Sequence, residues 1–381
     1  MEKVVVIVGA GLSGLTCAYE VLKISSSKSY NVKVIVLEGR DRIGGRMYSE
    51  KGLDLGAAWS WPANDTQLMR LIQLLNLATP EPQYQTGKVL QQQSASKSTA
   101  NVKVVGQNVG PAGENSIRFK NGTFSIASQF ASHLLSTTPI QILLNSRVTQ
   151  VNQLSSKNDI NNKTSTPPVH IEVVSTVDGT TNVHHAHAVV LAVPPRLIAK
   201  TIGFLPQLPA EKLDAMERTP TWMEDTGKVG LIYSNPFWRT KGFSGTAFSQ
   251  CGPLVQVWDN SDEITFALCG FVMDDDSRNE ITLRRSILKQ LQLLFGPEAA
   301  TPLHVLLKLW STDPFTAVAK NNSTRTTSPM LPFGTSSVRS LHLNAVFAGT
   351  ETAPNEHGHM NGAVIAGYRA ASEVIQILKD M

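Results

Sequence analysis

The sequence predicts an α/β protein in which a Rossmann-like nucleotide-binding domain is interleaved with a second, reduced α+β domain carrying a mainly antiparallel sheet. Residues 4–8 are a continuous apolar run that leads directly into a glycine-rich turn, as expected of a buried parallel strand. Residues 12–22 and 33–37 follow as a helix and a second strand. The middle of the chain instead alternates apolar and polar residues between turns, which is typical of antiparallel strands.

The remaining elements follow from the spacing of the apolar residues. We expect the resulting order to divide the chain into five segments. Helical spacing predicts helices over residues 65–77, 282–295 and 362–378, and alternation or a buried apolar run predicts strands over 170–176, 183–193, 223–233, 254–258, 264–272 and 342–348. Residues 1–78, 119–204 and 331–381 are expected to form the nucleotide-binding domain, and residues 79–118 and 205–330 the second domain.

Composition excludes several classes of function. The chain has 381 residues and a formal net charge of +4, and no run of lysine and arginine exceeds two residues, so we expect no nucleic-acid partner. No apolar stretch reaches the ~20 residues of a membrane span, so we expect no membrane span. The three cysteines, Cys17, Cys251 and Cys269, are widely spaced, which fits no disulfide framework and favours a reducing, cytoplasmic location.

Three nearby histidines, His184, His185 and His187, suggest a metal at first sight. On a strand only His185 and His187 would share a face. No carboxylate or cysteine stands at ligand spacing. We therefore expect no metal site.

A glycine loop between the first strand and the first helix carries the strongest signal. Gly9 permits a tight turn, Gly11 lets backbone N–H groups approach a pyrophosphate, and Gly14 lets helix and strand pack closely. Leu12 and Ser13 open the helix, whose N-terminus favours an anion. Glu38, at the end of the second strand, is placed to accept hydrogen bonds from a ribose diol.

The residues after Glu38 favour FAD over a nicotinamide cofactor. Arg40, Gly44, Gly45 and Arg46 place cations and a second glycine pair just beyond the ribose-binding acid. Arg46 can meet the pyrophosphate charge, and the glycines let the backbone pass beside a bulky cofactor. A domain that binds only a nicotinamide has no need of them.

This region resembles the flavin-containing amine oxidase family, the group of monoamine, polyamine and L-amino-acid oxidases. Residues 54–59 (DLGAAW), 189–195 (VVLAVPP) and 348–364, with GTET and GHMNGAV, are similar to family segments in the expected order. The resemblance implies an FAD site, and it adds to the residues above Ala57, Ala58, Trp59, Val148, Trp310, Gly349, Glu351, His359 and Met360. A helix beginning near Met360 would direct its N-terminus at the flavin edge where negative charge collects.

Lys228 opens a segment, KVGLIYSNPFW, that reproduces a family spacing. In relatives this lysine is water-bridged to flavin N5, so the resemblance implies a catalytic role for Lys228. A buried ammonium readily loses its proton, and beside reduced flavin it would assist electron transfer to O₂. The implied reaction oxidises the C–N bond of an amine, possibly a polyamine, to an imine and then a carbonyl compound, with O₂ leaving as H₂O₂.

The chain departs from the family at the substrate side of the flavin. Two aromatic rings flank the substrate nitrogen in many relatives, but the matching positions here are Lys320 and His359, with Phe315 as an alternative to Lys320. We count Trp59, Lys320 and His359 with Lys228 as candidate catalytic residues. Ala319 stands near the position of the cysteine that tethers FAD in monoamine oxidases, so we expect noncovalent FAD.

Several alternatives remain open. Trp59 stands where amino-acid oxidases place a carboxylate-binding arginine, yet Lys320 could receive that carboxylate. A desaturase acting on C–C bonds and a flavoprotein without turnover share the same fold. The segment between residues 78 and 117 is shorter than in relatives, which implies a trimmed substrate domain.

Overall fold

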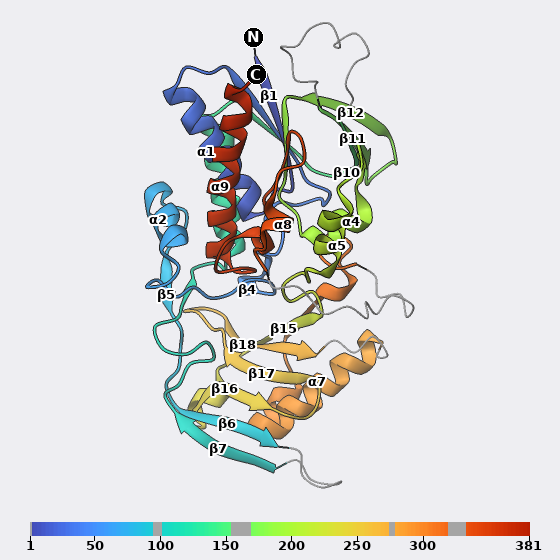
Figure 1. Cartoon of the computed structure of the whole chain (residues 1–381). Helices are drawn as coiled ribbons and strands as arrows, with labels where there is room; N and C mark the ends of the chain where they lie inside the picture. Colours follow the sequence, from blue (N-terminus) through green and yellow to red (C-terminus); the bar gives the residue numbers. More distant parts are fainter. Residues whose placement is uncertain (1, 94–100, 154–168, 274–278, 319–332) are drawn as a thin grey trace, which may run out of the picture.

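The computed structural model describes residues 2–93, 101–153, 169–273, 279–318 and 333–381. Two bodies are stacked on each other, one carrying α1 (Leu12–Ser27) and α9 (Met360–Lys379), the other a large sheet with α7 (Glu280–Phe295) (Figure 1). The chain crosses between the bodies several times, as the change of colour along the ribbon shows. The candidate site lies where they meet.

A five-stranded parallel sheet forms the centre of the first body, in the order β20-β13-β1-β2-β9. Its strands come from three separate parts of the chain. They are β1 (Lys3–Val8), β2 (Val32–Leu37), β9 (Ile140–Leu143), β13 (Ala188–Leu191) and β20 (Ala345–Phe347). Most of their side chains are buried, because both faces of the sheet are covered.

One face of this sheet packs against helices, and the other against a second sheet. The helical face joins α1 and α9 to α2 (Thr66–Leu75) and α3 (Phe124–Thr137) in one apolar cluster. Gly367 permits the close α1–α9 contact, because a Cβ there would lie 2.6 Å from the carbonyl oxygen of Ser13. The opposite face packs on the four-stranded sheet β12-β11-β10-β14, formed by β10 (Ser146–Asn152), β11 (Val169–Ser175), β12 (Thr181–Ala186) and β14 (Gly203–Leu205).

The second body is built on a seven-stranded sheet, in the order β19-β15-β18-β17-β16-β6-β7. All neighbours are antiparallel except β16 and β6. The strands are β6 (Lys88–Gln93), β7 (Asn101–Gln107), β15 (Thr226–Tyr233), β16 (Phe243–Ser249), β17 (Leu254–Asp259), β18 (Phe266–Met273) and β19 (His304–Leu309). One face packs on α7, while the other meets Leu53, Leu55 and Trp59 of the first body.

Short elements complete the described chain. They are β3 (Ser49–Glu50), β4 (Leu53–Asp54), β5 (Pro80–Pro82), β8 (Ile117–Phe119), α4 (Pro195–Thr201), α5 (Ala210–Arg218), α6 (Phe237–Thr240), α8 (Ser336–Arg339) and the 3₁₀ turns η2 (Pro297–Ala300), η3 (Trp310–Thr312) and η4 (Thr350–Thr352). None of the helices within the described ranges combines the length and apolar character needed to cross a bilayer.

The predicted fold class is confirmed, but some elements differ. The strand expected over 183–193 is two strands, β12 and β13, which belong to different sheets. His187 lies at the break, where its Nδ1 accepts a hydrogen bond from the backbone N–H of Val4 at 2.9 Å. His185 therefore does not share a strand face with His187 and instead packs edge-on against His170, at 4.5 Å between ring centroids. The strand expected over 342–348 is shorter, because a turn at His342 precedes β20.

Candidate active site

The glycine loop joins β1 to α1, and its three glycines have different surroundings. Gly9 has φ +102°, and a Cβ on Gly14 would lie only 2.0 Å from the Gly9 carbonyl oxygen, so both glycines are needed for the turn and its packing. A Cβ on Gly11 would meet nothing closer than the Cα of Gly45, at 4.0 Å. Gly11 is therefore open towards the cavity, and no side chain caps the N-terminus of α1. This arrangement suits an anion.

Glu38 is held at the end of β2 by the backbone. Its side chain is only 3% exposed; Oε2 accepts a hydrogen bond from the N–H of Ala10 at 2.9 Å and Oε1 accepts one from the N–H of Arg40 at 3.0 Å. Both bonds fix the direction of the carboxylate beside the glycine loop. The position matches the one expected for a ribose-binding acid.

The second glycine pair packs directly against the first loop. The N–H of Gly44 donates to the Ala10 carbonyl at 2.9 Å, and Gly44 and Gly45 have φ of +91° and +57°. A Cβ on Gly44 would lie 2.8 Å from the carbonyl oxygen of Met47. These glycines thus form a second wall that packs directly against the first loop, where side chains would not fit.

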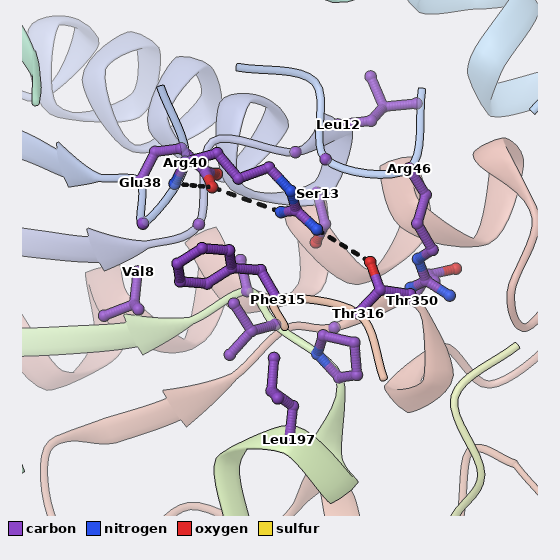
Figure 2. Close-up of a pocket in the computed structure, with 18 of the residues that line it drawn as sticks. Val8, Leu12, Ser13, Glu38, Arg40, Arg46, Leu197, Phe315, Thr316 and Thr350 are labelled. Atoms are coloured by element: carbon purple, nitrogen blue, oxygen red, sulfur yellow. Dashed lines mark hydrogen bonds and ion pairs between the residues drawn. The ribbon is translucent and has the colours of Figure 1, made fainter. Parts of the chain in front are cut away.

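We call the resulting cavity the glycine-lined pocket. Figure 2 shows Glu38 and Arg40 from one wall and Phe315 and Thr316 from another. Its lining includes most of the predicted cofactor residues: Gly9, Gly11, Leu12, Ser13, Glu38, Arg40, Gly44, Gly45, Arg46, Ala57, Val148, Gly349, His359 and Met360. Sequence analysis missed the contributions of Arg147, Pro194, Leu197 and Thr350.

Phe315 lies at the end of this pocket beside Glu38. A Cβ on Gly39 would overlap its ring at 2.2 Å, and the Arg40 guanidinium lies 5.3 Å from the ring centroid. Arg40 also pairs with Asp313 at 2.6 Å and donates to Thr316 Oγ1 at 2.9 Å. Phe315 lines the glycine-lined pocket and not the aromatic pocket around Lys228, so the structure does not bring it beside Lys228.

Asp313 is the anchor of that segment. Burial raises its pKa, but the charges of Arg40 and Lys308 outweigh burial and lower the pKa to about 2. Asp313 therefore stays ionised at all physiological pH values and holds the residues after η3 against the loop that follows β2.

An ion pair between the partly exposed Arg46 and the buried Glu351 joins two distant parts of the chain at the site. Glu351, fully buried in η4, meets Arg46 through two contacts, at 2.7 and 3.1 Å. Glu351 also accepts the N–H of Trp222 at 3.1 Å, and Arg46 donates to the Trp222 carbonyl at 3.2 Å. Glu351 itself lines neither pocket. Its contacts instead hold Arg46 and Trp222 in place.

The second cavity, which we call the aromatic pocket, adjoins the first through Arg46, Ala57, Gly358, His359 and Met360. Its other lining residues come from both bodies. They are Gly56, Ala58, Trp59, Trp61, Asp65, Trp222, Met223, Thr226, Lys228, Phe271 and Trp310. Sequence analysis identified Ala58, Trp59, Lys228 and Trp310, and missed Asp65, Trp222, Met223 and Phe271.

Lys228 lies on β15 and points towards the first body. Its Nζ donates to the Gly56 carbonyl at 2.6 Å and to the Asp54 carbonyl at 3.5 Å. The rings of Trp59, Trp258 and Phe271 lie 5.0–5.3 Å from Nζ. Only 5% of the residue is exposed, and burial lowers its pKa to about 8 despite the opposing charge of Asp54. Lys228 can therefore exchange a proton near neutral pH.

The start of α9 forms the boundary between the pockets. The helix begins at Met360, as predicted, and His359 is the residue immediately before it. The His359 ring stacks on Trp61, with a centroid distance of 6.1 Å, and meets Trp222 edge-on at 5.3 Å. Gly358 has φ +77°, and a Cβ there would overlap Trp222 at 2.2 Å. Trp61, His359 and Trp222 thus form one aromatic group at the boundary between the two pockets.

Three predicted residues have structural roles, and two of them, Trp59 and Trp310, also line the aromatic pocket. Gly14 lies behind the glycine loop, and Trp59 and Trp310 donate their indole N–H groups to Gln83 Oε1 at 3.1 Å and to the Leu55 carbonyl at 2.9 Å. Trp59 and Trp310 still present a ring face to the aromatic pocket. Lys320 and Ala319 fall outside the described residues.

Comparison with known proteins agrees with this geometry. The model of the flavin containing amine oxidoreductase family matches residues 95–375, and an NAD(P)-binding Rossmann-like domain model matches residues 7–75. The chain belongs to the flavin containing amine oxidoreductase family. In the described residues, no three His, Cys, Asp or Glu side chains gather as a metal site would require.

Individual relatives match over shorter stretches. A probable flavin-containing monoamine oxidase A of Dictyostelium discoideum is 30% identical over 213 residues, covering 53% of this chain and 44% of that protein. The flavin-containing amine oxidase B of Sus scrofa is 31% identical over 235 residues, covering 57% and 43%. The matches thus span less than half the length of these curated relatives.

Solved structures share the fold along the whole chain. The cyclohexylamine oxidase of Brevibacterium oxydans has a TM-score of 0.76 at 18% identity, covering all of both chains. Putrescine oxidase bound to putrescine has a TM-score of 0.73 at 20% identity, covering 99% of both chains. Family membership implies FAD, and the glycine-lined pocket fits it: Gly11 leaves room for backbone approach, the N-terminus of α1 is uncapped, and Glu38 is oriented beside both.

Proposed function

We propose that this member of the family is an FAD-dependent amine oxidase that acts on a C–N bond. The observation that carries the proposal is Lys228, a buried ammonium on β15 beside the aromatic pocket. An unpaired buried cation is costly, and its contacts with two backbone carbonyls and three rings hold Nζ at this place. FAD held in the glycine-lined pocket would supply the two-electron oxidation of an amine C–N bond to an imine by hydride transfer, with O₂ as the electron acceptor and H₂O₂ as the second product.

The protein's own contribution is positioning, exclusion of water and proton handling. The aromatic walls from Trp59, Trp61 and Trp222 provide an apolar surface for the carbon chain of an amine. Lys228 can hold or release a proton at Nζ, because burial brings its pKa to about 8. The start of α9, at Met360, would direct a helix dipole at negative charge that develops where the two pockets join.

We propose noncovalent FAD, a small-molecule amine and O₂ as the partners of this site, and cytoplasmic action. The three cysteines are free: Cys17 and Cys269 are buried and Cys251 is partly buried, which agrees with a reducing compartment. We also propose domain boundaries at residues 78, 118, 204 and 330. The sheet of β1, β2, β9, β13 and β20 supports placing residues 1–78, 119–204 and 331–381 in one domain, because its strands come from all three segments.

Anaerobic titration of the purified yellow protein tests the function. Monoamines, polyamines and amino acids are added separately, and bleaching of the flavin absorbance is followed. Bleaching by an amine, with H₂O₂ released on admitting air, supports the proposal. Bleaching by amino acids alone would assign an L-amino-acid oxidase, and an unchanged spectrum with every amine would refute amine oxidation and leave a desaturase or a flavoprotein without turnover.

A further inference from the structure

Asp65 is a buried carboxylate in the wall of the aromatic pocket that the proposed reaction does not use. It is 3% exposed and precedes α2. Its Oδ2 accepts two hydrogen bonds, from Ser60 Oγ at 2.7 Å and from the N–H of Trp61 at 2.8 Å. Its Oδ1 has no hydrogen-bond donor among the described residues.

Helix capping does not account for this carboxylate. An aspartate immediately before a helix usually accepts N–H groups of the first turn, but Asp65 makes no such bond. The Asn361 side chain of α9 takes that role instead, accepting the N–H groups of Gln67 and Leu68 at 3.1 and 3.0 Å. Asp65 is thereby left free to present its second oxygen to the cavity.

The groups around Oδ1 are suited to bind a cation. A carboxylate oxygen without a donor in a cavity wall can accept a charge-assisted hydrogen bond from a cation, and Asp65 is the one carboxylate among the described residues that line the aromatic pocket. Trp61 and Trp222, in the same lining, offer ring faces to which an ammonium group is attracted. The cations of the lining, Arg46 and Lys228, already have partners of their own.

We propose that Asp65 binds a second, protonated amino group of the substrate, so that the preferred substrates are linear diamines or polyamines rather than monoamines. This inference rests on the proposed amine oxidase function. The Oδ1 atom would accept a charge-assisted hydrogen bond from the distal ammonium, while the reacting amino group lies nearer Lys228. Asp65 would thus bind the distal end of the substrate, while the reacting end lies on the side of Lys228.

The Asp65→Asn variant tests this directly. Because one oxygen, Oδ2, accepts both internal hydrogen bonds, the amide oxygen can keep them while the NH₂ group replaces Oδ1. The surface variant Asp214→Asn makes the same charge change on α5, where the Asp214 side chain is 60% exposed. Anaerobic flavin bleaching gives kcat/KM for a series of linear diamines and for monoamines of matching chain length.

We expect Asp65→Asn to lower kcat/KM for diamines by about 10- to 100-fold, the effect of one charge-assisted hydrogen bond, and to change that for monoamines by less than about threefold. Asp214→Asn should change neither. Equal losses for both substrate classes, or no loss, would overturn the inference while leaving amine oxidation intact. As a second measurement, the unmodified protein should prefer diamines by at least about tenfold; equal rates would overturn it even if the variant fails to fold, and bleaching by no amine would refute the proposed function itself.

Discussion

The two adjoining pockets are built in different ways. The glycine-lined pocket lies around the backbone turns after β1 and β2 and the N-terminus of α1, with side chains such as Glu38, Arg40 and Phe315 completing its walls. The aromatic pocket is formed by large side chains from distant elements, including Trp61, Trp222 and Phe271. The glycine turns fit a nucleotide cofactor, whereas side-chain walls can change without altering the fold. We therefore expect the first pocket to decide cofactor loading and the second to decide the substrate.

The largest effect should come from filling the space above Gly11. A Cβ there has room in the fold, with Gly45 Cα at 4.0 Å as its nearest neighbour, but it would occupy the space that a pyrophosphate needs. We expect Gly11→Val to purify colourless, with FAD affinity reduced at least about 100-fold, the loss of two backbone contacts. Its unfolding midpoint without FAD should stay close to that of the unmodified apoprotein. Retained yellow colour would contradict the division between the pockets.

Glu351 tests how much its ion pair with Arg46, which lines both pockets, stabilises the fold. Glu351→Gln removes the charge that pairs with Arg46; because the Arg46 side chain is 25% exposed, we expect a cost of about 1–3 kcal/mol, the loss of hydrogen bonds to a charged group. We expect this loss of unfolding free energy in urea denaturation. Glu217→Gln is the control, because that carboxylate pairs with Lys200 at a side-chain exposure of 32% and should cost less than about 1 kcal/mol. Equal costs would show that the Arg46–Glu351 pair stabilises the fold no more than an exposed pair does.

Lys228 should make stability depend on pH. Its pKa is about 8 in the folded protein against an ordinary value of 10.5. Below pH 8 both states hold the proton and the burial penalty is complete; between about 8 and 10.5 only the folded state releases it, so this lysine destabilises less as pH rises. The stability difference between Lys228→Met and the unmodified protein should shift by on the order of 3 kcal/mol from pH 7 to pH 11. A constant difference would exclude the lowered pKa.

The Lys228→Met variant also separates the roles of the two pockets by its kinetics. We expect Lys228→Met to slow reoxidation of the reduced protein by O₂ about 100-fold, because a proton donor near the reacting atoms is lost. FAD retention should change by less than about threefold, since Lys228 lines only the aromatic pocket. Stopped-flow absorbance measures the first quantity and ultrafiltration the second. Loss of FAD without slower reoxidation would remove Lys228 from the reaction.

The smallest effect is expected at Trp222. Trp222→Phe keeps a ring against Gly358 and His359 but shortens the wall of the aromatic pocket. We expect KM for amines to rise by about two- to fivefold with kcat unchanged, as for the loss of part of an apolar contact. Steady-state H₂O₂ release measures both constants. A large fall in kcat would indicate that Trp222 takes part beyond shaping the wall.

The glycine-lined pocket could be predicted because its residues carry local constraints. Gly9, Gly14 and Gly44 are required by positive φ or by backbone contact, and such positions recur at fixed spacing beside a strand and a helix. Glu38 was recognisable for the same reason, as the last position before the chain turns away from β2.

The aromatic pocket depends on contacts across the whole chain, which spacing does not encode. Phe315 was placed by distance from Trp310, yet it packs on Gly39 at the other end of the site. Asp65 entered the sequence analysis only as the first residue of a helix over 65–77, and only the hydrogen bonds from the start of α2 to Asn361 show that Asp65 does not cap that helix. Trp222 had one available signal, its position six residues before Lys228 in the segment that leads into β15.

The central sheet has a consequence for how the protein is made. Its edge strand β20 completes the sheet, and the segment after it and the start of α9 line the glycine-lined pocket, although β1 and α1 are synthesised much earlier. During translation the early β-α-β unit cannot complete its packing until residues 345–378 have left the ribosome, and until then its apolar faces are incompletely covered. Cofactor capture is therefore a late event in biogenesis, and truncations near residue 340 should yield insoluble rather than merely inactive chains.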